Sequence, residues 1–291
     1  MTAILGLNSL DGVLMMADTE EFLGGGAKSQ CDKLYRFIFK CGNTVGTVIT
    51  GGAGDSHLID CANQDMHLFF KESRSGLPDN TQDPREVLTA LKKFAKWYFT
   101  ETLQQYQGVS AELVPSMEML IAVSLKHGSY LFCWKGGRVQ YIPSPQHMAI
   151  GSGVVQLHPM LRDIQFSGTK ECMFFHGIRM MYHTKRAVLG VGGKTEAMAL
   201  LNDGATLYYG TDSAQKTEEL VINFEEFLMK VLYMDVSIVA TDVLELDGNV
   251  AKSLREMPHR LNYYRDAYRK ILYPNFKPTR SKPRATRTKL K

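Results

Sequence analysis

The sequence predicts an α+β fold for most of its 291 residues. Two observations lead to this prediction. Short apolar runs bounded by Asn, Asp, Ser and Gly are typical of strands joined by turns, and apolar residues that repeat every three or four positions are typical of amphipathic helices. These patterns follow one another as strands, two helices, strands, two helices and strands. Grouped elements of this kind favour α+β layers over alternating βαβ units.

The first predicted element is a β-hairpin, because the apolar runs 3–7 and 13–17 flank turn-forming residues at 8–12. A Gly-rich loop at 24–26 follows, and the glycines from Gly51 onwards are expected to end the fourth strand in a turn. The predicted strands span residues 3–7, 13–17, 34–39, 44–50, 119–125, 130–134, 139–142, 198–201 and 206–209.

Helices are predicted where the apolar spacing lengthens to three and four residues. Pro84 suits the first turn of one helix, in which Val87, Leu91 and Phe94 would share a buried face. Pro159 interrupts the pattern of another helix. The predicted helices span residues 55–71, a segment from 84 onwards, two segments after 153, 218–232 and an added segment at 250–272.

The composition is that of an ordinary globular protein, with 44% hydrophobic and 22% charged residues. No apolar run approaches the length of a membrane-spanning helix, and the N-terminus lacks the basic and apolar regions of a secretory signal. The five cysteines show no C-x-x-C spacing. We therefore expect a cytoplasmic protein with reduced cysteines and no membrane partner.

Positive charge is concentrated at the C-terminus. The formal net charge is +4, and residues 277–291 hold seven basic residues and no acid, so the rest of the chain is net acidic. We expect one domain over residues 1–245 and a helical and basic extension over 246–291. The tail could neutralise phosphates, but it lacks interleaved aromatic residues, so nucleic-acid binding is not expected.

Three motifs that would indicate other chemistry are incomplete. Gly193-Lys194-Thr195 is similar to the end of a phosphate-binding loop, but Val188 stands where that loop needs a glycine. The glycines of Gly151-Ser152-Gly153 flank the serine directly, which differs from G-x-S-x-G and indicates a tight turn. No histidine lies in metal-ligand spacing, so we expect no metal and no cofactor.

The first 55 residues contain an ordered set of features. Thr2 follows the initiator Met, Asp18 lies in D-G-V-L-M-M-A-D-T at 11–19, Lys33 lies in C-D-K-L at 31–34, and G-G-A-G occupies 51–54. This set resembles the β-type subunits of the proteasome, which are N-terminal-nucleophile (Ntn) hydrolases, and is closest in style to bacterial proteasome-related proteases. The resemblance implies a four-layer αββα sandwich and threonine-type hydrolysis of peptide bonds.

The chemistry of this reaction explains the residue types. A hydroxyl is a weak nucleophile without an adjacent base, and an N-terminal threonine carries its own base, the α-amine. An α-amine has a pKa of about 8, and a nearby ammonium lowers that pKa. By the resemblance, Thr2 is the nucleophile, Lys33 is the ammonium, and Asp18 is the carboxylate that holds Lys33.

The remaining site residues also follow from the resemblance. Gly51, or Gly52 as the near alternative, is expected to aim a backbone N–H at the developing oxyanion. Ile49, with Gly52, would contact the substrate, and Ile49 would line an apolar pocket for its side chain. Ser152 would assist the amine of Thr2.

One stretch departs from the family pattern. The family's D-x-x-S-G-G corresponds here to residues 188–193, where Val188 and Val191 replace the aspartate and the serine. The mechanism also requires removal of Met1, because otherwise the nitrogen of Thr2 is an amide. Threonine is small, so we expect the initiator Met to be removed, and we expect no long propeptide.

The same resemblance implies partners. The chain would form a ring with other copies of itself, act on unfolded polypeptide, and receive it from an ATP-dependent unfoldase. Two alternatives remain open at this point. One is a non-catalytic, proteasome-like structural subunit, and the other is an Ntn amidase acting on a small-molecule amide.

Overall fold

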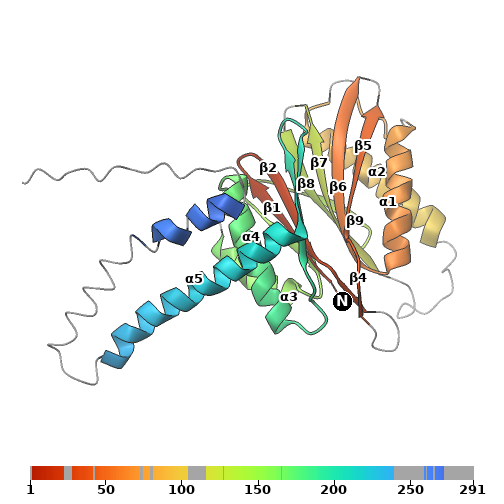
Figure 1. Ribbon diagram of the computed structural model, residues 1–291. Helices are drawn as coiled ribbons and strands as arrows, with labels where there is room; N and C mark the ends of the chain where they lie inside the picture. Colours follow the sequence, from red (N-terminus) through yellow and green to blue (C-terminus); the bar gives the residue numbers. More distant parts are fainter. Residues whose placement is uncertain are drawn as a thin grey trace, which may run out of the picture. The chain divides into compact units, whose positions relative to one another are not determined.

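The computed structural model divides the chain into two compact units, Met1–Glu218 and Glu219–Lys291, and each is treated by itself. Helices and strands alternate in groups, as predicted (Figure 1). The structure describes residues 2–22, 28–41, 43–72, 75–78, 81–103, 116–126, 128–164, 166–238, 259, 261–264 and 266–271.

The first sheet has the strand order β10-β1-β2-β11-β12, with every neighbouring pair antiparallel. The predicted N-terminal hairpin is confirmed, and its strands are buried along almost their whole length. A strand covered on both faces gives a continuous apolar run instead of an alternating one. The strands are β1 (Ala3–Ser9), β2 (Gly12–Asp18), β10 (Met148–Gly151), β11 (Thr195–Leu201) and β12 (Thr206–Tyr209).

The second sheet is an antiparallel meander in chain order, β5-β6-β7-β8-β9. Its strands are β5 (Leu34–Cys41), β6 (Thr44–Gly54), β7 (Met117–Leu125), β8 (Gly128–Lys135) and β9 (Arg138–Ile142). Every strand of this meander was predicted, although each extends one to four residues beyond a predicted end. The meander places β5 at one edge of the sheet.

The predicted turn at Gly51 is wrong, because β6 continues through Gly54. Gly51 pairs with Leu34 on one side and with Leu120 on the other. A Cβ at Gly51 would lie 2.8 Å from Ile4 Cγ2, and a Cβ at Gly52 would lie 2.4 Å from Ile59 Cγ2. These two glycines therefore allow close packing on the two faces of a strand.

Two helices pack on each sheet. α1 (Ser56–Lys71) and α2 (Pro84–Leu103) contact the second sheet, and α3 (Val154–Asp163) and α4 (Lys170–Ala187) contact the first (Figure 1). Asp55 caps α1, since its side chain accepts a hydrogen bond from the Leu58 N–H at 3.0 Å. Pro159 lies within α3 and does not end it.

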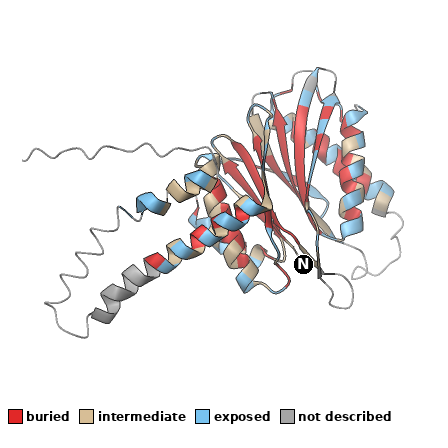
Figure 2. Cartoon of the chain, viewed as in Figure 1, coloured by how far each residue is buried: buried red, intermediate tan, exposed pale blue. Residues whose placement is uncertain are grey.

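Apolar side chains are buried on both sheets, and two of the clusters that they form among the described residues bear on the site (Figure 2). One contains side chains of both sheets, among them Ile4 and Met15 from the first and Leu120 from the second. The other joins the second sheet to its helices and includes Phe70 of α1 and Phe94 of α2. The predicted mixture of strands and helices in grouped order is confirmed at this level.

A small two-stranded sheet was not predicted. β3 (Glu20–Phe22) pairs with β4 (Lys28–Gln30), on either side of the predicted Gly-rich loop at 24–26, which lies outside the described residues. Both strands are short and largely polar, so no apolar pattern marks them. The strand β10 was also not predicted.

α5 (Thr211–Ile238) starts earlier and ends later than the predicted helix at 218–232. In the second unit, Tyr264 Oη donates a hydrogen bond to the Asn223 carbonyl at 3.0 Å, and its ring lies 5.3 Å from that of Phe224. The described residues from 259 to 271 are helical, within the predicted segment. No helix among the described residues combines the length and apolar character needed to cross a membrane.

Candidate functional site

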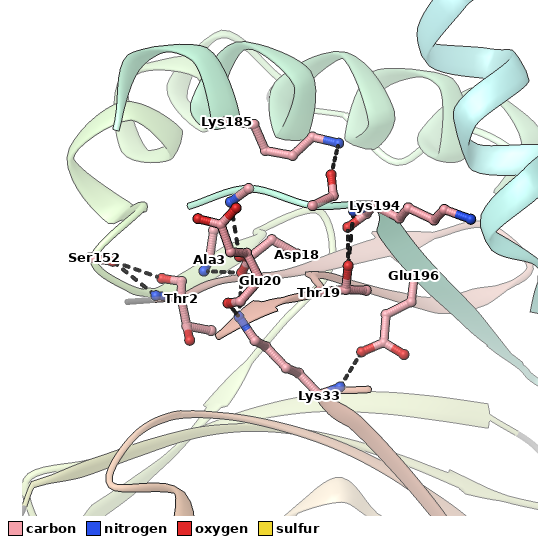
Figure 3. A network of polar contacts seen from close by, with 12 residues as sticks. Thr2, Ala3, Asp18, Thr19, Glu20, Lys33, Ser152, Lys185, Lys194 and Glu196 are labelled. Carbon is pink, nitrogen blue, oxygen red and sulfur yellow. Dashed lines mark hydrogen bonds and ion pairs between the residues drawn. The ribbon is translucent and has the colours of Figure 1, made fainter. Parts of the chain in front are cut away.

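Thr2, Asp18 and Lys33 meet where three strand ends come together (Figure 3). Because β1 and β2 are antiparallel, the residue before β1 lies beside the end of β2, and Ile4 pairs with Ala17. Lys33 directly precedes β5, on the second sheet, and its side chain reaches toward Asp18. Residues far apart in the sequence therefore gather at one place.

Asp18 is the centre of this group. Its buried carboxylate accepts the Ala3 N–H at 2.8 Å and the Lys33 ammonium at 3.0 Å on the same oxygen, Oδ1. The second oxygen, Oδ2, accepts the Gly192 N–H at 3.2 Å. Both oxygens are therefore occupied, and one of the donors carries a full positive charge.

Lys33 is held at both ends. Its ammonium, only 8% exposed, also donates to the Glu20 carbonyl at 2.6 Å. Its backbone N–H donates to Glu196 Oε1, as does the N–H of Leu34 at 2.9 Å. An ammonium removed from water stays charged only with such partners, and these contacts fix it beside the start of β1.

The Gly151-Ser152-Gly153 turn holds Thr2 from the other side. The Thr2 nitrogen donates to Ser152 Oγ at 3.0 Å, and Ser152 Oγ donates to the Thr2 carbonyl at 3.2 Å. Gly151 has φ +84°, and a Cβ there would lie 2.3 Å from the Thr2 carbonyl oxygen. Only glycine allows this close approach, so the turn that was predicted from the sequence also positions Ser152.

Glu118 supports this turn, although no motif in the sequence indicated it. Its Oε2 accepts the Gly151 N–H at 3.2 Å, and its Oε1 pairs with Lys135 at 2.6 Å. Glu118 lies on β7 of the second sheet, whereas Gly151 ends β10 of the first. The contact therefore ties the two sheets together next to Thr2.

The predicted substrate-side residues lie on β6. Gly51 lies beside Leu34 and against Ile4, close to the group around Asp18, whereas Gly52 faces Ile59 of α1 on the opposite side of the strand. Ile49 is fully buried in the core between the sheets. A substrate side chain could reach Ile49 only if neighbouring side chains moved.

Glu196 is the buried carboxylate that sequence reasoning missed. Its Oε1 accepts two backbone N–H groups, while Oε2 has no hydrogen-bond partner among the described residues. Burial raises the pKa of Glu196 to about 7, although these N–H bonds and the Lys33 charge act to lower it. A signal was available, since Glu196 falls on the same strand face as the apolar Met198 and Leu200.

Residues 188–193, which differ from the family pattern, contribute a backbone N–H group to the site instead of side chains. Val188 is the C-cap of α4, its N–H donates to the Thr184 carbonyl, and Val191 is buried. The Gly192 N–H reaches Asp18. No carboxylate or hydroxyl from these six residues is available to the site.

Other chemistry finds little support in the described residues. No three His, Cys, Asp or Glu side chains among them could hold a metal ion. Cys31, two residues before Lys33, is not a rival nucleophile, because burial and the nearby Glu21 raise the pKa of its thiol to about 11. The hydroxyl of Thr2 is therefore the nucleophile candidate at this position.

Comparison with known proteins identifies the fold. Neither a protein-family model nor a curated protein matches the sequence. Three similar solved structures are each 14% identical to this chain. Anbu (ancestral beta-subunit) from Yersinia bercovieri has a TM-score of 0.62, and the match covers 79% of this chain and 96% of that one.

Two further Anbu structures are similar. The helical assembly of the Anbu complex from Pseudomonas aeruginosa has a TM-score of 0.60, with 79% of this chain and 95% of that chain covered. An Anbu (Gly-1) mutant from Hyphomicrobium sp. strain MC1 has a TM-score of 0.57, with 81% and 100% covered. The chain therefore shares its fold with proteasome-like Anbu proteins.

These matches correct the family resemblance drawn from the sequence, which pointed to the proteasome β-type subunits. The similar structures are Anbu proteins, a distinct proteasome-like family, and no family model supports the earlier assignment. The resemblance rested on short motifs around Thr2, Asp18 and Lys33. Such motifs build the shared hairpin and strand ends, so they do not separate one family of this fold from another.

Proposed function

We propose that this chain is a threonine-type hydrolase of peptide bonds, with Thr2 as the nucleophile once Met1 is removed. One observation carries the proposal. Asp18 Oδ1 accepts both the Ala3 N–H and the Lys33 ammonium, so a fixed positive charge lies next to the residue that bears the hydroxyl. Ser152 at the Thr2 nitrogen supports it from the opposite side.

In the proposed reaction, Thr2 Oγ attacks the substrate carbonyl carbon while the α-amine of Thr2 accepts the hydroxyl proton. The amine passes that proton to the leaving nitrogen, and an ester remains on Thr2. Water, deprotonated by the same amine, then cleaves the ester and restores the hydroxyl. Lys33 supplies positive charge near the developing negative charge, and Ser152 orients the amine.

Residues of β6 are proposed to bind the substrate and to stabilise the oxyanion. Gly51 lies close enough to the group around Asp18 to make its backbone N–H the proposed oxyanion donor. Gly52 remains the alternative, although its missing side chain faces α1. The buried Ile49 beneath them favours an apolar substrate side chain.

Assembly and partners belong to the same proposal. The Anbu complex of Pseudomonas aeruginosa forms a helical assembly, and we infer that this chain also assembles with copies of itself, in a ring or a helical arrangement. Such an assembly would act on unfolded polypeptide, supplied by an ATP-dependent unfoldase, in the cytoplasm. Neither a membrane nor a nucleic acid is a proposed partner.

The layered architecture and the domain division are also proposed. The two sheets share one core and each is packed by two helices, which supports an αββα order of layers. The proposed division of the chain at residue 245 falls outside the described residues.

Peptide turnover in matched variants tests the proposed function. We expect Thr2→Ala to lower the rate at least about 1000-fold, because it removes the nucleophile. Lys33→Ala should also be strongly impaired. Lys170→Ala is the matched control, since Lys170 pairs with Glu171 at 3.0 Å in a partly exposed ion pair. Intact mass reports whether Met1 has been removed.

Three outcomes would contradict the proposal. Equal turnover by the wild type and Thr2→Ala would place any activity elsewhere. A mass that retains Met1 in protein with no turnover would favour a non-catalytic structural subunit. Turnover of small amides but not of peptides, lost in Thr2→Ala, would assign the same nucleophile to a small-molecule amidase.

A further inference from the structure

Glu196 connects the two sheets next to the proposed nucleophile. It lies on β11 of the first sheet, where it pairs with Ala17, the residue before Asp18. Its Oε1 accepts the N–H groups of Lys33 and Leu34, at the start of β5 in the second sheet. The neighbouring strands β2 and β11 therefore hold both parts of Lys33, the side chain through Asp18 and the main chain through Glu196 (Figure 3).

The position of β5 explains the need for such a contact. β5 is an edge strand among the described residues, with β6 as its neighbour in the second sheet. Backbone N–H groups at a buried strand end need an acceptor, since a buried N–H without one costs free energy. Glu196 supplies that acceptor for two consecutive residues, Lys33 and Leu34. It therefore holds the backbone of Lys33 in place at the start of β5.

Backbone capping alone does not require a carboxylate. A glutamine could offer the same Oε1 acceptor without burying a charge. Glu196 is fully buried, and its Oε2 has no hydrogen-bond partner among the described residues. A buried polar atom without a partner calls for an explanation, and here the explanation must involve the charge or the proton of this carboxyl group.

Resting on the function proposed above, we infer that Glu196 is a positioning residue for the threonine site: its carboxylate fixes the start of β5 and thereby the reach of Lys33 to Asp18, and its protonation weakens that hold. Glu196 touches no reacting atom in this scheme. It acts through Lys33.

The ionisable groups around Glu196 come from several elements. Asp32 acts to raise the pKa of Glu196 and Lys33 acts to lower it, so their effects oppose each other. Burial raises the pKa of the Cys31 thiol and of the Tyr208 hydroxyl, so both stay neutral. The groups are Cys31, Asp32 and Lys33 before β5, Tyr208 on β12, and Asp18 at the end of β2, beside Thr195.

The direction of the pH effect follows from hydrogen-bond strength. An ionised carboxylate accepts N–H bonds about twice as strongly as a neutral acceptor. Above a pH of about 7 the carboxylate form holds Lys33 and Leu34 firmly, and below it the protonated form holds them less firmly. The site should therefore lose reactivity on the acid side through Glu196 as well as through the Thr2 amine.

Two readouts on Glu196 variants test the inference. The first is the rate at which a threonine-directed β-lactone labels Thr2, measured from pH 5.5 to 9. The second is amide hydrogen exchange at Lys33 and Leu34, which does not depend on activity. Glu196→Gln keeps the Oε1 acceptor without the charge, Glu196→Ala removes both, and Glu171→Gln is the control at a partly exposed ion pair.

For Glu196→Ala we expect labelling to slow by about 10- to 100-fold and exchange at Lys33 and Leu34 to speed up by at least about tenfold. Glu196→Gln should keep most of the amide protection. The pH profile of its labelling rate should show one ionisation on the acid side, that of the Thr2 amine. The wild type should show two, because Glu196 also ionises. Glu171→Gln should match the wild type in both readouts.

The outcomes separate this inference from the proposed function. Wild-type protein that takes no label at any pH removes the proposed function, and unchanged exchange in Glu196→Ala then overturns the anchoring of β5 as well. Normal labelling of the wild type, with the same rate and pH profile in both Glu196 variants, overturns the inference alone. If Glu196→Ala does not fold, the pH profile of Glu196→Gln decides the question.

Discussion

Asp18 and Glu196 are both fully buried carboxylates on adjacent strands, yet their surroundings differ. Asp18 accepts three hydrogen bonds over both oxygens, and one of them comes from the Lys33 ammonium. Glu196 accepts two backbone N–H groups on one oxygen, its other oxygen has no partner among the described residues, and burial raises its pKa to about 7. Partners, and not burial alone, determine the protonation of a buried acid.

The two carboxyl groups therefore have different roles in the proposed site. Asp18 holds the Lys33 ammonium beside Thr2 through a buried ion pair at 3.0 Å. The carboxyl of Glu196 suits a group that changes its proton occupancy near neutral pH. The four predictions that follow separate these two roles, from the largest expected change in stability to the smallest.

The largest effect is expected for Asp18→Asn. This change keeps the size of the side chain but leaves the Lys33 ammonium, 8% exposed, without its counter-charge. Breaking a buried ion pair in this way costs about 3–5 kcal/mol. Urea unfolding at pH 7 measures this loss in the free energy of unfolding. A loss under about 1 kcal/mol, as for an exposed ion pair, would show that Asp18 does not hold a buried charge.

Glu196→Gln should change the pH dependence of stability. The folded pKa of about 7 lies above the ordinary value of 4.5, so the native state binds this proton more tightly. The stability that this proton contributes is complete below a pH of about 4.5 and is lost as the pH rises through about 7, an effect on the order of 3 kcal/mol. Relative to the wild type, Glu196→Gln should therefore gain this amount between pH 4 and pH 8.

Unfolding curves at several pH values measure the Glu196 effect. Glu171→Gln is the control, because Glu171 is partly exposed. A stability difference between the wild type and Glu196→Gln that stays constant from pH 4 to pH 8 would mean that Glu196 titrates normally, and the contrast with Asp18 would disappear.

Gly51→Ala tests the packing beside both carboxylates. The added methyl group would lie 2.8 Å from Ile4 Cγ2 and 2.9 Å from Leu34 Cδ2, so side chains must move. Overpacking of this kind costs about 1–3 kcal/mol. Gly210→Ala is the matched control, since nothing lies within 4 Å of its added Cβ. Equal melting temperatures for the two variants would contradict the tight packing at Gly51.

The smallest effect is expected for Lys170→Ala. Lys170 pairs with Glu171 at 3.0 Å and with Asp11 at 3.9 Å, and all three side chains are partly exposed. Solvent screens such pairs, so the loss should be under about 1 kcal/mol and should shrink further in salt. A loss as large as that of Asp18→Asn would remove the distinction between buried and partly exposed ion pairs.

Local patterns predicted most of the fold. The apolar runs at 3–7 and 13–17 predicted the hairpin, and Pro84 marked the start of α2. The turn predicted at Gly51 was wrong because glycine permits both turns and close packing. Only the positions of Ile4 and Leu34 show that close packing applies here.

The site could be predicted only in part. Thr2, Asp18 and Lys33 were selected by their motifs, and the structure brings them together, while their catalytic roles remain a prediction. Glu196 was missed because its role depends on the pairing of β11 with β2, between residues far apart in the sequence. No local pattern indicates that pairing.

The most direct test of the central claim is a peptide map after treatment with a threonine-directed epoxyketone. We expect an adduct on an N-terminal peptide that begins at Thr2, joined through both its amine and its hydroxyl, and no adduct on Thr2→Ala. An N-terminal peptide that stays unmodified, or an adduct on another residue, would contradict the claim that Thr2 is the nucleophile.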